Sequence, residues 1–481
     1  MLFNSISFLV FFTLLVIIYF IIPHKYRLWL LIGASIYFYY SFIPIYLLLI
    51  LYVIVVNYSS GIFIDKGKGI IRKLLLTLSI ILNLSVLFYF KYFNFFANSL
   101  TNFAQLIHWN YSLETLAIIL PIGISFFTFQ GLGYVFDIYR ETIKPERNFF
   151  VFSLFKFYFP QLIAGPIERA KNLIPQFGIE QKFEYKRVTD GLKLMVWGLF
   201  KKIVIADRLV SVVNVVYGNP QVYMGSPTIL ATFFFAFQIY CDFSGYSDMA
   251  IGMSQVLGIR LMDNFNRPYS AKSIPEFWRR WHISLSTWFR DYVYFPLGGN
   301  KKGMVRMYLA IVIVFLISGL WHGANWTFVV WGGLHAIYML SSISTQNIRN
   351  KFNQKIGITE YPRIHKVIKI LIVFILVSIS WIFFRASTIS DAWFMLTHLF
   401  TNLSFDIFAM NLKVSKANLI LSFFFIFVME VVHFVQSHQG IRSQFLVKLP
   451  VYIRWGIYLF LILSILLFGV FGEVYFIYFQ F

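Results

Sequence analysis

Cysteine is almost absent from this chain: Cys241 is the single cysteine among 481 residues. A lone cysteine excludes an intrachain disulfide and any metal site built from cysteine thiolates. We interpret Cys241 as a small core residue, with a thioester-forming thiol as the alternative. Charged side chains are scarce too, at 13% of the residues, whereas a soluble domain carries roughly a quarter. This shortage excludes an ordinary water-soluble globular protein.

Acidic residues are few, since 20 Asp and Glu stand against 41 Lys and Arg, for a formal net charge of +21. Such an excess can mark a nucleic-acid-binding protein. Here, however, the basic residues occupy short loops between apolar runs, as the positive-inside rule predicts for membrane proteins. We therefore expect these charges to face a lipid bilayer, and we expect no nucleic acid as a partner.

Several signatures of catalytic sites are also missing from the sequence. It contains no G-x-x-x-x-G-K-[ST] phosphate loop, no G-x-S-x-G nucleophile elbow and no H-E-x-x-H zinc motif. The segment PLGGNKKG (296–303) has the wrong spacing for a phosphate loop. Its Lys301 and Lys302, with nearby backbone amides, can still meet a phosphorylated cofactor on the cytoplasmic side. No metal site is expected.

Long apolar runs are what the chain does contain. It is 59% hydrophobic and 21% aromatic, and runs such as SFLVFFTLLVIIYFII approach or reach the ~20 residues that cross a bilayer. We predict an all-α polytopic integral membrane protein with about 11–12 transmembrane helices plus re-entrant and interfacial helices. One domain over residues 1–481 is the simplest organisation. The predicted spans are 5–22, 28–43, 45–64, 74–96, 115–139, 191–216, 228–257, 307–320, 325–345, 367–386, 417–436 and 455–473.

Two segments do not read as simple spans. The predicted span 191–216 holds Lys201, Lys202 and Asp207, so it can instead lie on the membrane surface as an amphipathic helix. The segment FYFPQLIAGPIERAKN (157–172) is interrupted by prolines and a glycine, which break helix hydrogen bonding. Irregular backbone at membrane depth survives only inside protein or beside a wet cavity. We predict a re-entrant element there.

The distribution of basic residues predicts an orientation. Lys and Arg follow the first, third and fifth predicted spans, whereas 97–113 and 217–227 contain none. The N-terminus is therefore expected outside and the basic loops in the cytoplasm. This rule places His322 toward the non-cytoplasmic half of the membrane and the region of His282 toward the cytoplasm.

The first candidate for chemistry is His282, in SIPEFWRRWHISLSTWFRDY (273–292). Helical spacing groups it with the aromatic residues of one face, while Arg279 and Arg280 fall largely on the other. The spacing predicts one helix with His282 on its buried face. The alternative is an interfacial helix whose histidine satisfies a neighbouring carbonyl.

The second candidate is His322, in the turn WHGAN between two predicted spans. Ionisable groups inside a membrane are costly and usually line a functional cavity, and histidine can take and return a proton at neutral pH. The alternative is a helix-capping histidine. Asn325 is expected to cap the next helix. His335 lies too far along that helix to share a small site with His322 unless the helix is broken, so we expect a packing or hydrogen-bonding role.

Two carboxylates, Asp242 and Asp248, fall within the predicted span 228–257. Carboxylates at membrane depth suggest the wall of a polar cavity. They can orient a histidine or pair with Arg279 or Arg280. The sequence leaves both possibilities open.

Long motifs in this chain resemble the membrane-bound O-acyltransferase family. The resemblance is greatest to the branch that contains the alginate O-acetyltransferase membrane subunit and the peptidoglycan O-acetyltransferase. It covers most of the chain after about residue 120. The matching segments are PIGISFFTFQGLGYVFDIYR (121–140), FPQLIAGPIERA (159–170), QIYCDFSGYSDMAIG (238–252), NFNRPYSAKSIPEFWRRWHISLSTWFRDYVYFPLGGN (264–300), SGLWHGANWTFVVWGGLHA (318–336) and FIYFQF (476–481).

The resemblance implies a fold, a reaction and roles for particular residues. The family's W-H-G block, here at 321–323, makes His322 the catalytic residue, and its W-H-x-S-x-S block, here at 281–286, makes His282 essential. The fold is expected to divide into variable N-terminal spans (1–110), a catalytic core (115–345) and C-terminal spans (346–481). Further candidates for substrate or cofactor binding are Trp281, Trp321, Asn325, Asp242, Asp248, Lys301 and Lys302.

The resemblance also implies an acyl donor, an acceptor and a location. Acetyl-CoA is the expected donor substrate, and no permanently bound cofactor is expected. The expected acceptor is an extracytoplasmic polysaccharide, alginate-like or peptidoglycan, served by a periplasmic acetyltransferase partner of the SGNH type. The expected location is the bacterial inner membrane. The alternatives are D-alanine or fatty-acyl transfer by the same fold, and a non-enzymatic transporter or flippase.

Overall fold

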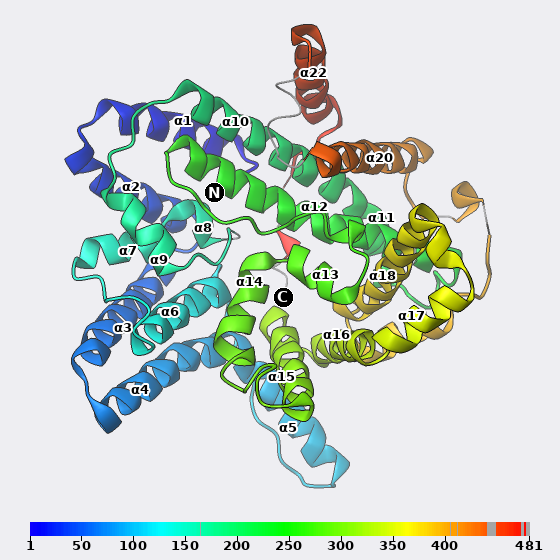
Figure 1. The fold of residues 1–481 in the computed structure, drawn as a ribbon, viewed down its shortest axis with the longest axis horizontal. Coiled ribbons are helices and arrows are strands. Elements are labelled where there is room, and N and C mark those ends of the chain that lie inside the picture. The colour runs from blue at the N-terminus through cyan, green and yellow to red at the C-terminus, as the bar shows by residue number, and fades with distance from the viewer. Residues whose placement is uncertain (164, 405, 411, 440–448, 473–475, 478–481) are drawn as a thin grey trace. The chain divides into compact units, whose positions relative to one another are not determined.

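The structure is a computed structural model of residues 1–481, described here except for residues 164, 405, 411, 440–448, 473–475 and 478–481. Within the described residues every regular element is a helix (Figure 1). The prediction of an all-α chain is confirmed. The end of the predicted span 455–473 and most of the motif 476–481 lie outside the described residues, except for Phe476 and Ile477.

The helices form two compact units, residues 1–193 with 250–262 and residues 194–249 with 263–481. The prediction of a single domain with three parts stays a prediction. The first unit contains α1 (Ile6–Ile21), α2 (His24–Tyr40), α3 (Tyr46–Lys66), α4 (Gly69–Leu87), η1 (Phe88–Tyr92), α5 (Phe93–Leu106), α6 (Ile124–Tyr139), α7 (Phe149–Phe157), α8 (Phe159–Leu162), α9 (Ala170–Leu173) and η2 (Ile174–Gly178).

The second unit holds all the candidate site residues. It contains η3 (Phe200–Ala206), α11 (Asp207–Gly218), η4 (Pro268–Ser270), α13 (Ile274–Arg280), α14 (Ile283–Phe289), η5 (Arg290–Tyr294), α15 (Met304–His322), α16 (Trp326–Ser344), α17 (Gln346–Lys355), η6 (Ile358–Glu360), α18 (Pro362–Arg385), α19 (Ile389–Thr397), η7 (Ile407–Ala409), α20 (Lys416–Gln439) and α22 (Val451–Phe468). Two helices, α10 (Tyr185–Leu199) and α12 (Ser226–Val256), contribute residues to both units.

A buried hydrogen bond between two asparagine side chains links two helices of the first unit. Helices α3, α4 and α6 lie side by side (Figure 1). Asn57 on α3 and Asn83 on α4 are both buried, and Asn57 Nδ2 donates to Asn83 Oδ1 at 3.0 Å. Between otherwise apolar helices, such an amide pair satisfies polar atoms that lipid would leave without partners.

Eight helical stretches among the described residues are long and apolar enough to cross a membrane, which makes this a multi-pass membrane protein. They match eight of the twelve predicted spans. The other four predicted spans correspond to α1, α2, α6 and the run from α10 to α11. The first three of these helices have 16 or 17 residues each, which is at or below the shortest typical spanning length of about 17.

The predicted span 115–139 begins too early. Residues 107–120 form no helix, and α6 starts only at Ile124. Pro121 cannot donate a helix hydrogen bond, and Gly123 has a left-handed φ of 78°. The segment 157–172 is broken as predicted: between α8 and α9, residues 163 and 165–169 are non-helical and buried. Whether it re-enters a membrane stays a prediction.

The charged run within 191–216 does not lie on the surface, contrary to the alternative drawn from its amphipathic pattern. Lys201 and Lys202 belong to the π-helical turn η3 and are buried, as is Asp207 at the start of α11. The alternative is wrong because the two lysines have acidic partners on α12, which are described below.

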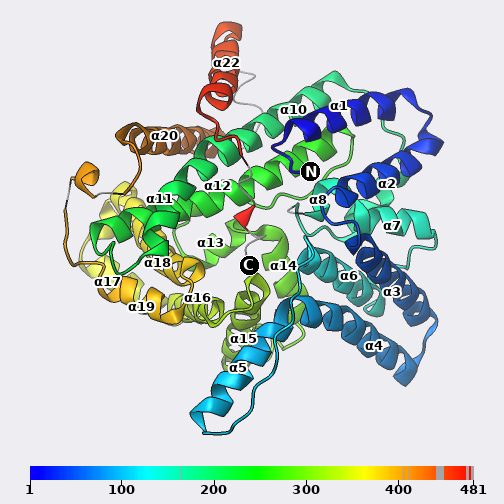
Figure 2. The same cartoon turned by 180° about the vertical axis from the view of Figure 1, so that it is seen from behind.

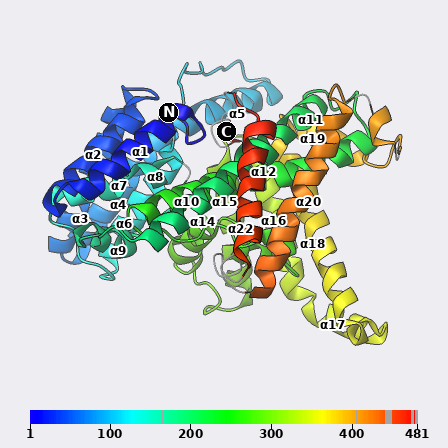
Figure 3. The ribbon, with the colours of Figure 1, turned by 90° about the horizontal axis from the view of Figure 1, so that it is seen from above.

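Helices α15 and α16 form a closely packed hairpin in the second unit. A Cβ atom on Gly319 would stand 2.2 Å from the Phe328 carbonyl oxygen, and one on Gly332 would stand 2.3 Å from that of Phe315. The two helices therefore cross at the closest approach that only glycine permits. Helix α16 also packs against α18 (Figure 3), and α18 packs in turn against α19 (Figure 2).

This crossing predicts opposite effects for two adjacent glycines. Gly332→Ala forces a methyl group onto a backbone carbonyl, so we expect a lower thermal unfolding midpoint and less folded protein in detergent. Gly333→Ala is the matched control, because a Cβ there meets nothing within 4 Å. It should be neutral or stabilising by about 0.5–1 kcal/mol, since alanine is the better helix former. Equal midpoints for the two variants would contradict the close crossing.

Candidate active site

His322 ends α15, and the chain turns at once into α16. Asn325 is the N-cap of α16: its Oδ1 accepts a hydrogen bond from the Thr327 amide at 3.0 Å. The predicted cap is confirmed. The Asn325 Nδ2 atom donates to the Ser387 carbonyl at 3.2 Å, which ties the turn to the segment after α18. His322 is 2% exposed and therefore lies inside the protein.

His282 does not lie on a continuous helix, so the prediction of one helix over 273–292 is wrong. Helix α13 ends at Arg280, Trp281 is extended, and His282 has a left-handed φ of 42° before α14 begins. The break is stable because Asn264 supplies acceptors for the next amides. Its carbonyl oxygen accepts from Ile283 N at 2.9 Å, and its side chain accepts from Ser284 N at 3.3 Å. Left-handed backbone at a non-glycine residue costs roughly 1–2 kcal/mol and is concentrated at functional sites.

The two histidines lie next to each other. The ring centroids of His282 and His322 are 6.4 Å apart, and the Trp321 ring contacts both, at 5.8 and 5.0 Å between centroids. The orientation rule had assigned them to opposite halves of the membrane. Their proximity excludes positions on opposite sides of a bilayer core, which is about 30 Å thick, and the half of the membrane that holds the pair stays a prediction.

Both imidazoles sit in an aromatic cage. Phe243 meets the His282 ring edge-on at 4.6 Å, and Trp331 and Phe384 meet the His322 ring at 5.0 and 5.4 Å. Burial lowers the pKa of His282 to about 3, so that imidazole is neutral at pH 7. A neutral imidazole can accept a proton, and here it is a weaker base than a free imidazole because burial disfavours the charged ring.

His335 approaches this cage because the helix is broken at the turn. Trp331, one turn earlier on α16, stacks edge-on with both His322 and His335, the latter at 4.8 Å. The His335 Nε2 atom lies 2.9 Å from the Ser380 hydroxyl on α18. The expected hydrogen-bonding role is therefore observed.

The carboxylates of α12 pair with lysines, which sequence reasoning had not considered. Asp242 Oδ1 lies 2.8 Å from Lys202 Nζ, and Asp248 Oδ2 lies 2.9 Å from Lys201 Nζ. Lys202 also lies 2.8 Å from Asp207. The signal was present in the sequence, because two lysines in a predicted span need buried partners.

Asp242 also accepts a hydrogen bond from the main chain. Its Oδ2 accepts a hydrogen bond from the Ile477 amide at 2.7 Å, and the neighbouring Phe476 ring packs against Tyr246 at 4.7 Å and Phe243 at 5.6 Å. Residues 476 and 477 are thereby attached to α12 beside the Phe243 ring, which contacts His282.

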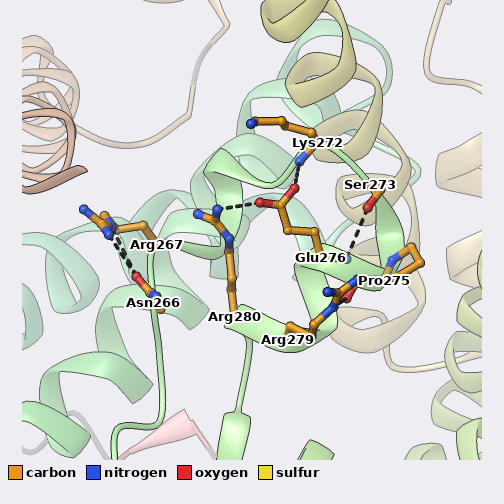
Figure 4. Close-up of polar contacts among 8 residues, drawn as sticks. All are labelled: Asn266, Arg267, Lys272, Ser273, Pro275, Glu276, Arg279 and Arg280. Atoms are coloured by element: carbon orange, nitrogen blue, oxygen red, sulfur yellow. Dashed lines mark hydrogen bonds and ion pairs between the residues drawn. The ribbon is translucent and has the colours of Figure 1, made fainter. Parts of the chain in front are cut away.

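The two arginines of α13 have partners on their own segment (Figure 4). Arg280 Nη2 lies 2.5 Å from Glu276 Oε1, and the Lys272 amide donates to Glu276 Oε2 at 2.8 Å. Burial raises the pKa of Glu276, but these hydrogen bonds and the Arg280 charge outweigh it and leave the pKa below its ordinary value. Arg279 Nε donates to the Pro275 carbonyl at 3.3 Å.

The remaining candidates separate into buried and exposed residues. Trp281 and Trp321 are both buried: Trp321 contacts the two imidazoles, whereas Trp281 packs against Phe265 and Trp381. Lys301 and Lys302 are exposed in the turns after η5, and their phosphate-binding role stays a prediction. Cys241 is fully buried, with its Sγ 3.3 Å from Met429 Sδ, which favours the core interpretation.

Comparison with known proteins places these residues in a family. The family model "MBOAT, membrane-bound O-acyltransferase family" matches residues 143–389, which include both histidines. The chain is 37% identical over 407 residues to "Probable alginate O-acetylase AlgI" of Pseudomonas aeruginosa, covering 84% of this chain and 74% of that protein. The chain belongs to the membrane-bound O-acyltransferase family. The resemblance seen in its motifs is confirmed.

Two further relatives of this membrane-bound O-acyltransferase carry informative names. "Peptidoglycan O-acetyltransferase" of Helicobacter pylori is 37% identical over 393 residues, covering 76% of this chain and 72% of that protein. "Teichoic acid D-alanyltransferase" of Streptococcus thermophilus is 28% identical over 291 residues, covering 57% and 70%. The chain is thus a multi-pass membrane enzyme that transfers an acyl group, and it requires an acyl donor and an acceptor.

Proposed function

We propose that this acyltransferase moves an acetyl group from acetyl-CoA toward an extracytoplasmic polysaccharide, alginate-like or peptidoglycan. The relatives named alginate O-acetylase and peptidoglycan O-acetyltransferase support the acetyl group and the polymer class. The structural observation that carries the proposal is the pair of buried imidazoles, 6.4 Å apart between ring centroids. Two proton-accepting groups at that spacing suit a reaction in which a hydroxyl attacks a thioester.

The proposed step follows from the chemistry of a neutral imidazole. A ring nitrogen of His322 accepts the proton of the acceptor hydroxyl while that oxygen attacks the acetyl carbonyl. The carbon–sulfur bond then breaks, and the leaving thiolate takes up the proton from the imidazolium. His282 lies beside His322, with both rings against the Trp321 ring, and assists by binding or by sharing this proton.

The basic loops support a direction for the transfer. The donor is proposed to arrive from the cytoplasm, with its phosphates near Lys301 and Lys302. A periplasmic acetyltransferase of the SGNH type is proposed to complete delivery outside the bacterial inner membrane. The positive-inside distribution of charge supports this direction.

D-alanine transfer is the second candidate, since the Streptococcus thermophilus relative is named a teichoic acid D-alanyltransferase. Its lower identity and smaller coverage of this chain favour acetyl transfer. The transporter alternative is set aside, because membership of the family makes the chain an enzyme.

The donor test separates the two candidates. The full-length chain in lipid vesicles is given acetyl-CoA or a D-alanyl thioester, each with an oligosaccharide acceptor, and release of the free thiol is measured. We expect acceptor-dependent thiol release from acetyl-CoA. Release from the D-alanyl thioester alone would overturn the acetyl proposal and leave the second candidate.

A further inference from the structure

Asn264 lies beside His282 and is the first residue of the matching segment 264–300. It stands between α12 and η4, is fully buried, and its side-chain oxygen lies within hydrogen-bond distance of three donors or potential donors. The distances from Oδ1 are 2.9 Å to Ser284 Oγ, 3.1 Å to His282 Nδ1 and 3.3 Å to Ser284 N.

The Ser284 backbone amide settles which amide atom of Asn264 faces the histidine. An N–H group can only donate, so the atom opposite it must be the oxygen rather than the NH₂ group. The NH₂ group then faces the other way, where Nδ2 donates to Ser247 Oγ on α12 at 3.2 Å. The Ser284 N–H group therefore fixes the orientation, and the Ser247 hydroxyl, which can donate or accept, is compatible with it.

This orientation decides the proton position on His282. Because Nδ1 faces an acceptor oxygen at 3.1 Å, it must carry the hydrogen. In a neutral imidazole the other nitrogen, Nε2, then holds the lone pair. Turning the ring over would place a carbon instead of Nδ1 opposite the Asn264 oxygen and lose this hydrogen bond, and Phe243 packs edge-on against the ring.

We propose that Asn264 is a positioning residue of the acyl transfer: it fixes His282 as the Nδ1–H tautomer and makes Nε2 the nitrogen that receives a proton. The assignment rests on the proposed function only for the use made of Nε2. In the transfer step, the acceptor hydroxyl proton, or the proton passed on by His322, moves to Nε2, the Nδ1–H bond to Asn264 stays intact, and the proton leaves with the thiolate.

A neutral amide partner also has a consequence for the charge of His282. Asn264 orients the ring without offering the negative charge that would stabilise an imidazolium. Other groups that contact the ring include Ser284, Trp321, His322 and the aromatic rings of Phe243 and Phe265. None of these named neighbours carries a negative charge.

Spectroscopy tests the tautomer without any activity. Nitrogen-15 NMR of the full-length chain with labelled histidine distinguishes protonated from unprotonated ring nitrogens, and a His282→Gln variant identifies the signal. We expect a protonated Nδ1 and an unprotonated Nε2 in the wild-type chain. The reverse tautomer would overturn the inference even if acetyl transfer were established, and the expected tautomer would stand even if the donor proved not to be acetyl-CoA.

Kinetics then test the positioning role. Asn264→Ala should lower kcat on the order of 10- to 100-fold, as loss of an orienting partner does elsewhere, with little change in KM. Asn264→Asp keeps the acceptor oxygen but adds charge, so kcat should recover at high pH while the acid limb of the pH profile moves to higher pH. Asn266→Ala, two residues away and exposed, is the control and should leave kcat unchanged. An Asn264→Asp profile that falls uniformly at every pH would show a merely structural role and overturn the proposal.

Discussion

Replacing His322 with asparagine is expected to lower the rate of acetyl transfer by about 10²- to 10⁴-fold, the usual contribution of a general base. Asparagine keeps a polar side chain at the end of α15 but cannot accept the acceptor's proton. The loss should fall on kcat, because asparagine removes the proton acceptor and leaves the rings of Trp321, Trp331 and Phe384 around the site in place. Thiol release from acetyl-CoA by the full-length chain in vesicles measures it.

The matched control for this prediction is the same substitution at an exposed histidine. His108 lies outside any helix with a φ of 54°, which asparagine tolerates. His108→Asn should transfer acetyl groups at the wild-type rate. A folded His322→Asn protein, with an unchanged thermal unfolding midpoint and more than a tenth of the wild-type rate, would remove His322 from the mechanism.

The second large effect is on stability. Lys202→Met should reduce the free energy of unfolding by about 3–5 kcal/mol, the usual cost of removing one partner from a buried ion pair. The lysine stands 2.8 Å from both Asp207 and Asp242. Its loss therefore leaves two buried carboxylates that repel each other. We expect little folded protein, with a strongly lowered unfolding midpoint in detergent.

Two further variants make this prediction specific. Lys186→Met removes a lysine whose side chain is 73% exposed and pairs with Asp190 one helical turn away, so its midpoint should hardly change. Adding Asp242→Asn to Lys202→Met removes one of the two stranded charges and should recover part of the lost stability. If Lys202→Met and Lys186→Met unfold at the same temperature, the buried pairs do not contribute as argued.

Some of this structure follows from local patterns, and some depends on pairing across the fold. The spans that became α15 and α16 were predicted within a few residues, because apolar runs and a capping asparagine are read from neighbours in sequence. The partners of Asp242 and Asp248 were not, since Lys201 and Lys202 lie on another element and meet them only after packing. An ion pair of this kind has no periodicity.

His282 shows the same limit at the candidate site. Its segment has helical spacing, so the pattern favoured one helix, but Asn264, 18 residues earlier, accepts the hydrogen bonds that let the helix break. The wrong separation of His282 from His322 has a related cause. The rule for basic loops describes where a chain leaves the membrane, and it contains no information on which loops fold back into the protein.

The position of Cys241 makes the chain unusually convenient for chemical labelling. Its thiol is the only native one and is sealed inside α12 against Met429. A water-soluble maleimide applied to intact cells or sealed vesicles would therefore react only with cysteines that are introduced on purpose. One cysteine in the segment before α6 and another in α17, where every described residue is at least partly exposed, would report which ends face the cell exterior. The side from which each substrate reaches the paired histidines can thus be read from reagent access, with no enzymatic assay.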